Sequence, residues 1–274
     1  MLSLLGGVRC EAPGPPKGNM DLAFVLLSKP GLPSAEEVVR AFPSFALEGQ
    51  RLQIRSSDRK AAGNDILEFD MGECGTGFVA AMPVPVPNEE AEDEVRFSIS
   101  ALGSGWRLLP HAAHLVVTLG GGDSLSRIAI LACFISFLAA VTKVSHSVGV
   151  YWGNAHATHD PAFFLSIAQE KGLTSRIMLW SGVSLAREPD GRLSLLSLGM
   201  EQLNLPDLLL VAPKSMSGND ALETFFDLVA YVADRGKRLP EGDTVGRTAD
   251  ERLPVRYVSS PVDAGKQVLR VEIK

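Results

Sequence analysis

The stretch from residue 111 to residue 160 constrains the fold of this chain more than any other part of it. An apolar segment at 115–119 leads into a glycine-rich turn, and an almost uninterrupted apolar run then extends over 128–141. A further apolar segment at 147–152 is followed by polar residues. This order predicts a strand, a turn, a long apolar helix over 123–142 and a second strand. Because the run is shorter than the roughly 20 residues that cross a bilayer, we expect no membrane-spanning segment and no membrane partner.

The residues before this stretch predict several strands and one helix. The helix follows Ser34, whose side chain can cap it, and we expect it to end before Pro43. A polar turn is expected at 58–64. Strands are predicted where apolar residues run together or alternate with polar ones, at 22–27, 50–56, 66–70 and 77–82.

The residues after the stretch predict both helices and strands. Asp160 and Pro161 are typical of a helix start, and we expect that helix to end at Gly172. Asp190 and Gly191 lie between two apolar runs and predict a hairpin. The remaining predictions are a loop at 154–160, strands at 176–185, 193–198, 208–211, 255–258 and 268–273, and an amphipathic helix at 219–235.

Strands mixed with helices, together with one definite hairpin, predict an α/β (α+β) fold. We expect a mixed β-sheet with helices packed against it. The predicted organisation is a disordered leader at 1–20, an N-terminal β-α-β-β half at 21–110 and a C-terminal α/β half at 111–274. The two halves open with a similar β-α-β order, although no residue-level repeat joins them.

Charge and cysteine content indicate the partners and the compartment. The formal net charge is −6 and the chain has no basic runs, so we expect no nucleic-acid partner. The three cysteines, Cys10, Cys74 and Cys133, are widely spaced and form no CxxC pair. This pattern predicts no disulfide framework and favours a reducing cytoplasm. Cys133 lies within the apolar run, so we expect it to be a small core residue.

Four segments together resemble a known family. They are AFVLLSKP, the GGD turn with its helix, VGVYWGNAHATHDP, and EGDTVGRTADERLPVRYVSSPVDAGKQVLRV. With these segments in this order, the chain resembles the bacterial family called domain of unknown function 4261. The resemblance runs through most of the chain after residue 20. It implies a cytoplasmic bacterial protein of unassigned activity, and it carries over no catalytic residues.

The best candidate for a ligand site is the end of the strand at 147–152. Trp152 offers a flat stacking surface, Gly153 permits close backbone approach, and Asn154 supplies both donors and acceptors. Ligands of open α/β sheets bind at the carboxyl ends of strands. The alternative is that Trp152 packs the core and that Asn154 is a turn residue.

Two histidine pairs lie in the same stretch, and the second of them extends this candidate site. His156, His159 and Asp160 offer the nitrogen and oxygen atoms that zinc accepts. Their spacing brings two rings together on a helix, whereas we expect a loop here. Histidines exposed in a loop or capping a helix are the alternative, so we predict no bound metal and no cofactor.

Secondary candidates lie in two turns. Gly121, Gly122 and Asp123 connect a strand to a helix, which is where phosphate-binding loops occur, but no lysine follows the glycines. A tight turn that leads into a capped helix is the simpler interpretation, with Asp123 or Ser124 as the cap. Asp243 can act as a cap or pair with an arginine, and either contact would hold the C-terminal strands.

Two functions remain open from the sequence. The first is a non-enzymatic binding or protein-interaction module, acting as an immunity or accessory factor on another protein. It is favoured because no complete catalytic motif is legible. The alternative is a hydrolase, with or without a metal, acting near Trp152–Asp160, where the histidines cluster.

Overall fold

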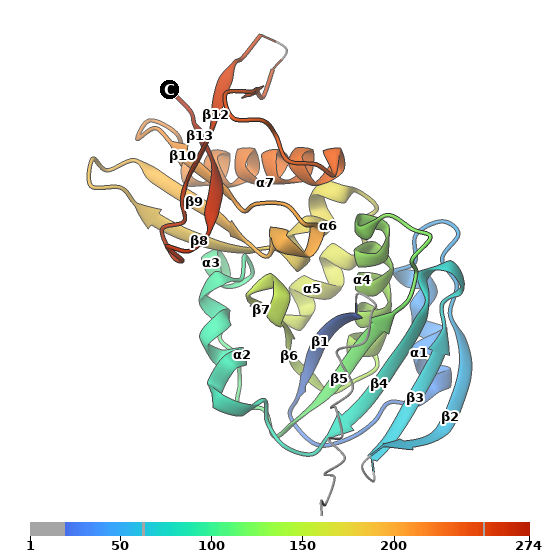
Figure 1. Cartoon of the computed structure of the whole chain (residues 1–274). Coiled ribbons are helices and arrows are strands. Elements are labelled where there is room, and N and C mark those ends of the chain that lie inside the picture. Colours follow the sequence, from blue (N-terminus) through green and yellow to red (C-terminus); the bar gives the residue numbers. More distant parts are fainter. Residues whose placement is uncertain (1–19, 62–63, 249) are drawn as a thin grey trace, which may run out of the picture.

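Two β-sheets organise the chain in the computed structural model, which describes residues 20–61, 64–248 and 250–274 (Figure 1). Helices pack against both sheets, which confirms the predicted α+β class. The strands form two sheets, whereas the sequence predicts one mixed sheet. Apart from Met20, the leader predicted at 1–20 lies outside the described residues.

The first sheet is antiparallel, with the strand order β2-β3-β4-β5-β1-β6-β7. Its strands are β1 (Met20–Leu27), β2 (Gln53–Ala61), β3 (Asn64–Asp70), β4 (Thr76–Met82), β5 (Ala113–Gly120), β6 (Ser147–Trp152) and β7 (Ala157–His159). Two predictions need correction. The turn predicted at 58–64 is too long: the backbone of β2 pairs with β3 as far as Ala61, and β3 begins at Asn64. Strand β7 lies in the loop predicted at 154–160, because its backbone pairs with β6.

The second sheet follows the first along the chain and is mixed. Its order is β11-β12-β13-β10-β9-β8, in which β10 and β13 are parallel and the other neighbours antiparallel. Its strands are β8 (Gly182–Arg187), β9 (Leu193–Leu198), β10 (Leu208–Ala212), β11 (Thr244–Val245), β12 (Leu253–Ser259) and β13 (Gln267–Glu272). The hairpin predicted around Asp190 and Gly191 is confirmed, and it joins β8 to β9.

Helix α4 (Arg127–Lys143) is the long apolar helix, and its residues are buried on nearly all sides. It starts later than the predicted residue 123. Gly121 and Gly122 both adopt positive φ, and the turn that they form extends to Leu125. The cap predicted at Asp123 or Ser124 is therefore wrong: Ser126 caps the helix through its hydroxyl.

The other long helices are α1 (Ala35–Ala41), α5 (Pro161–Gln169), α6 (Leu173–Trp180) and α7 (Gly218–Arg235). Ser34 caps α1 as predicted. The strand predicted at 176–185 is wrong in its first part, because residues up to Trp180 are helical. Gly172 precedes this helix instead of closing α5.

The buried side chain of Arg176 holds α6 in place. Its guanidinium donates to the carbonyl oxygens of Phe45, Ala168 and Glu170, each at 2.7 Å.

A strap of short helices crosses the edge of the first sheet at β7 (Figure 1). It consists of η3 (Pro87–Glu89), α2 (Glu90–Asp93), η4 (Glu94–Phe97) and α3 (Ala101–Ser104). Further single turns are η1 (Phe42–Ser44), η2 (Gly72–Cys74), η5 (Gly153–Ala155) and η6 (Met200–Leu203). Segments η4 and η5 bring the first sheet against the second.

One hydrophobic core joins the two sheets. It contains Val25 and Leu115 of the first sheet, Leu195 and Leu210 of the second, and the inward faces of α4 to α7. The boundary predicted at 110–111 lies between β4 and β5, which are neighbours in one sheet, whereas the sheets divide the chain between β7 and β8. None of the described helices is long and apolar enough to cross a membrane.

Cys74 and Cys133 form a disulfide, which the cysteine spacing did not predict. Cys74 ends η2, and Cys133 lies on α4. The two residues are 59 positions apart, so the sequence offers no local signal for the pair. The connection between β3 and β4 packs on α4 and brings their Cα atoms to 6.2 Å.

Candidate functional site

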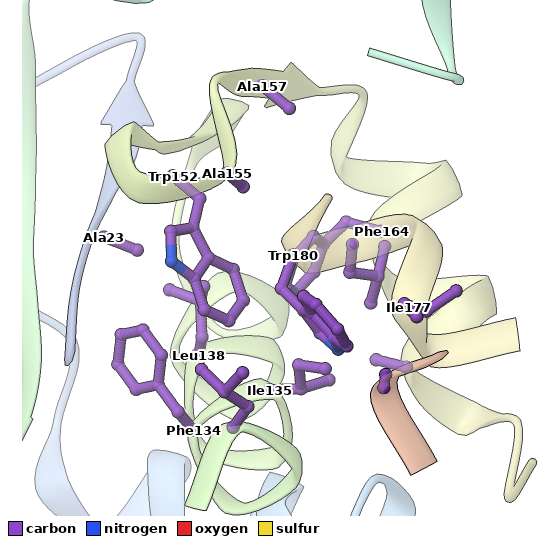
Figure 2. Packing of buried hydrophobic residues seen from close by; sticks show 14 of the residues in the cluster. Ala23, Phe134, Ile135, Leu138, Trp152, Ala155, Ala157, Phe164, Ile177 and Trp180 are labelled. Atoms are coloured by element: carbon purple, nitrogen blue, oxygen red, sulfur yellow. The ribbon is translucent and has the colours of Figure 1, made fainter. Parts of the chain in front are cut away.

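Trp152, the first residue of the predicted ligand site, lies in the hydrophobic core (Figure 2). Its side chain is fully buried at the end of β6. The indole ring meets Phe134 of α4 edge-on, with 5.0 Å between ring centroids. Figure 2 shows Trp152 and Trp180 both pointing toward α4. In this structure Trp152 therefore packs in the core, which is the alternative to a ligand-stacking role.

His159 is also fully buried, within a network of serine hydroxyls. Its Nδ1 lies 2.7 Å from the Ser98 hydroxyl, which is 2.7 Å from the Ser100 hydroxyl. Its Nε2 lies 3.0 Å from the carbonyl oxygen of Leu179. A carbonyl only accepts, so Nε2 carries the proton and Nδ1 accepts from Ser98. Burial lowers the pKa of His159 to about 4, so the ring is neutral and links the strap to α6.

The remaining polar residues near Trp152 have local roles. Asp160 caps α5, because its carboxylate accepts from the backbone N–H of Ala162 at 3.2 Å. Asn154 is exposed, and its backbone carbonyl accepts from the Gln202 amide at 3.0 Å. Gly153 begins η5. These residues therefore do not converge with Trp152 and His159 on one cavity.

His156 is the member of the predicted site that lines a cavity. Its backbone φ angle is 51°, in the left-handed region that residues other than glycine rarely adopt. Its Nδ1 lies 3.5 Å from a carboxylate oxygen of Glu94 in η4. The Glu94 carboxylate raises the pKa of His156, although burial opposes this effect. At neutral pH a larger fraction of this imidazole is protonated than in an ordinary histidine.

The topology of the second sheet brings several turns to the same cavity. Strand β10 is antiparallel to β9 and parallel to β13, and β13 is antiparallel to β12. The end of β9, the start of β10 and the turn between β12 and β13 therefore share one end of the sheet. Segment η4 of the strap and His156, directly after η5, line the cavity at that end.

Two adjoining cavities lie there, with volumes of about 290 and 390 Å³, and we call them together the junction groove. They share Glu201, Asp207 and Lys266. The cavity beside His156 is also lined by Arg96, Phe97, Leu198, Gly199, Ser260, Val262 and Asp263. The second cavity is completed by Leu205, Pro206, Arg238, Tyr257, Gly265 and Gln267. A polar cleft of this size fits a small ligand or a short peptide.

Arg96 is an exposed cation of the groove that forms no ion pair among the described residues. Its guanidinium lies over the ring of Phe97, with 4.7 Å from Cζ to the centroid. Of the other two cations, Lys266 is already paired with Glu201 at 2.8 Å, and Arg238 lines the second cavity, away from His156. Of the two guanidinium groups in the groove, that of Arg96 is therefore the one that lies beside His156, rests on an aromatic ring and is available to an incoming anion.

Asp207 lies deepest among the charged residues of the groove. Its carboxylate accepts from the Ser197 hydroxyl and the Met200 backbone N–H, both at 3.1 Å. Burial raises the pKa of Asp207, and the nearby carboxylate of Glu201 adds to the effect. A carboxyl group with a raised pKa beside a histidine with a raised pKa marks the groove as the strongest site candidate.

The secondary candidates do not line the junction groove. Gly121, Gly122 and Asp123 line a small cavity of about 180 Å³ at the start of α4. A Cβ atom at Gly122 would lie 2.9 Å from the backbone oxygen of Cys74, so close packing on η2 requires glycine. Asp243 accepts from the backbone N–H of Thr244 at 2.8 Å, a local contact of the capping kind. Among the described residues, no group of three or more His, Cys, Asp or Glu side chains is placed to hold a metal ion.

Sequence reasoning missed most of the groove. Arg96, Asp207 and Lys266 are far apart in the chain, and each lies in a short turn or helix without a motif. These three residues could be assigned to one site only if the order and direction of the strands in the second sheet were known. The one local signal was the polar segment after β6, which contains His156.

Comparisons with known proteins bear on the same region. The family model described as Domain of unknown function (DUF4261) matches residues 196–272. No curated protein and no solved structure matches the chain. The matched residues include β10 to β13 and α7, and they supply the second-sheet part of the junction groove.

Proposed function

We propose that this chain, whose residues 196–272 match the family of domain of unknown function 4261, is a non-enzymatic binding module. Its ligand is a segment of another protein, held in the junction groove. As a bacterial immunity or accessory factor, the chain would act through this contact.

The observation that carries the proposal is the unpaired guanidinium of Arg96 beside His156 in the groove. A guanidinium binds a carboxylate through two parallel hydrogen bonds. Phe97, Leu198 and Val262 supply apolar surface next to it, and Lys266 and Asp207 supply further polar groups. A peptide segment with one carboxylate and at least one apolar side chain matches this combination.

The alternative is a hydrolase that uses His156 as its base. The Glu94 carboxylate would orient the imidazole, as the third group of a catalytic triad does. In the described part of the chain, however, no hydroxyl or thiol lies within hydrogen-bonding distance of His156. Ser260 lines the same cavity, but its hydroxyl accepts from the backbone N–H groups of Val262 and Asp263. Binding therefore accounts for more of the geometry than nucleophilic catalysis does.

We place this activity in the cytoplasm. Three cysteines in a long chain are too few for a disulfide framework. A single disulfide is compatible with that location, because cytoplasmic disulfides that respond to the redox state do occur.

The test is a selection of peptides from a random-sequence display library on the intact protein, followed by fluorescence anisotropy with the selected peptides. Arg96→Ala should weaken binding roughly 10- to 100-fold, the value of a charge-assisted hydrogen-bond pair. Arg187→Ala is the matched control, since Arg187 is an exposed arginine at the opposite end of β8 from the groove. Equal affinities for the wild type and Arg96→Ala would contradict the proposal. Turnover of chromogenic esters or phosphate esters that is lost in His156→Ala would support the hydrolase instead.

A further inference from the structure

We infer that the Cys74–Cys133 disulfide is a site of thiol–disulfide exchange with small-molecule thiols. These thiols reach it through a cavity that both cysteines line. The inference uses residues of the first sheet and α4, and it is independent of the junction groove.

Both cysteines are buried, and the cavity that they line connects their disulfide to solvent. The exposed fractions of Cys74 and Cys133 are 5% and 3%. The cavity has a volume of about 550 Å³, and Ala129 and Ala132 of α4 line it beside the two cysteines. Exposed residues at its rim, including Glu48 and Arg51, open it to solvent. This volume accepts a thiol as large as a tripeptide, whereas a folded protein thiol cannot enter.

The amide of Gln50 distinguishes the two sulfur atoms. Its Nε2 donates to the Sγ of Cys133 at 3.4 Å. Its Oε1 accepts from the backbone N–H of Leu47 at 2.9 Å, which fixes the amide with its NH₂ group toward the sulfur. A donor at Cys133 stabilises negative charge there, so Cys133 is the better leaving group and attack is directed to Cys74.

The exchange proceeds in two balanced steps. A small thiolate attacks the Sγ of Cys74, a new S–S bond forms, and the electron pair of the broken bond goes to Cys133, which then takes a proton from water. A second small thiolate attacks the small-molecule sulfur of this mixed disulfide and releases Cys74 as a thiolate. The protein disulfide is thereby reduced by two electrons, and two small thiols are oxidised to their disulfide.

The experiment uses the full chain with Cys10→Ser, so that the pair is the only source of thiols. The oxidised protein is treated with reduced glutathione, and intact mass is recorded over time. The mixed disulfide formed by the oxidised Cys74–Cys133 pair is trapped with acid and located by peptide mapping, and we expect roughly tenfold more glutathione on Cys74 than on Cys133. Gln50→Leu should slow reduction of the disulfide roughly tenfold, the value of one hydrogen bond to a charged group. Gln53→Leu, at an exposed position of β2, should leave the rate unchanged.

Three outcomes would overturn the inference. The first is a protein whose two thiols stay free after treatment with oxidised glutathione. The second is equal adduct formation at both cysteines together with an unchanged rate in Gln50→Leu. The third is reduction by thioredoxin as fast as by glutathione at equal thiol concentration, since the cavity should exclude a protein thiol. Thermal melting of each variant shows whether the fold is retained, so a lost reaction can be assigned to the site.

Discussion

At the scale of single residues, the surroundings shift the pKa values of two histidines in one short segment in opposite directions. His156 reaches a cavity and pairs with Glu94, which raises its pKa. His159 is enclosed between Ser98 and the carbonyl oxygen of Leu179, and burial lowers its pKa to about 4. The sequence places both in one candidate site because they are three residues apart. Their separation depends on the pairing of β7 with β6, which no local pattern predicts.

The buried His159 predicts a specific pH dependence of stability. Its folded pKa lies below the unfolded value of 6.5, so the unfolded chain takes up the proton first as the pH falls. The stabilisation is complete above pH 6.5 and is lost between pH 6.5 and about 4, on the order of 3 kcal/mol. Urea unfolding should therefore show that the free energy of unfolding of the wild type exceeds that of His159→Asn by less at pH 4 than at pH 7.5. The expected decrease in this difference is on the order of 3 kcal/mol. A difference that does not change with pH would contradict this assignment.

At the scale of elements, the sequence predicts regular strands and helices well and their ends less well. The strand at 193–198 and the helix cap at Asp160 are confirmed, because apolar runs and capping residues act locally. Residues 176–180 are helical against their strand-like pattern, because Arg176 bonds to carbonyls of distant segments. The disulfide is missed for the same reason, since it depends on the packing of η2 against α4.

The start of α4 offers a direct test of such a correction. Ser126 accepts from the backbone N–H of Ala129, whereas the sequence alone favours Asp123 or Ser124 as the cap. Ser126→Ala should lower the free energy of unfolding by about 1 kcal/mol, the usual value of a helix cap. Ser124→Ala, two residues away in the exposed turn, should change it by less than about 0.5 kcal/mol. Chemical denaturation of the two variants measures both values, and a larger loss in Ser124→Ala would restore the sequence-based assignment.

At the scale of the whole molecule, the groove exists because the two sheets meet across a shared core. Arg127 at the start of α4 helps to fix this junction. Its guanidinium pairs with the buried carboxylate of Asp21 on β1 and donates to the carbonyl oxygen of Gln202 in η6, at 2.9 Å. Arg127 thereby connects the first sheet, α4 and the segment between two strands of the second sheet. A site formed by such a junction could not be read from a motif, because no single segment contains it.

The measurement that tests the central claim most directly is hydrogen–deuterium exchange of the intact protein with and without a selected peptide. Binding in the junction groove predicts slower exchange at 94–97, at 198–207 and at 260–267, with the remaining described residues unchanged. At a peptide concentration that half-saturates the wild type, the same peptide should give little protection in Arg96→Ala, because its affinity is at least about tenfold weaker. Protection centred instead on β1, where Met20 and Leu22 are exposed, or on the cavity at Cys74, would contradict the account.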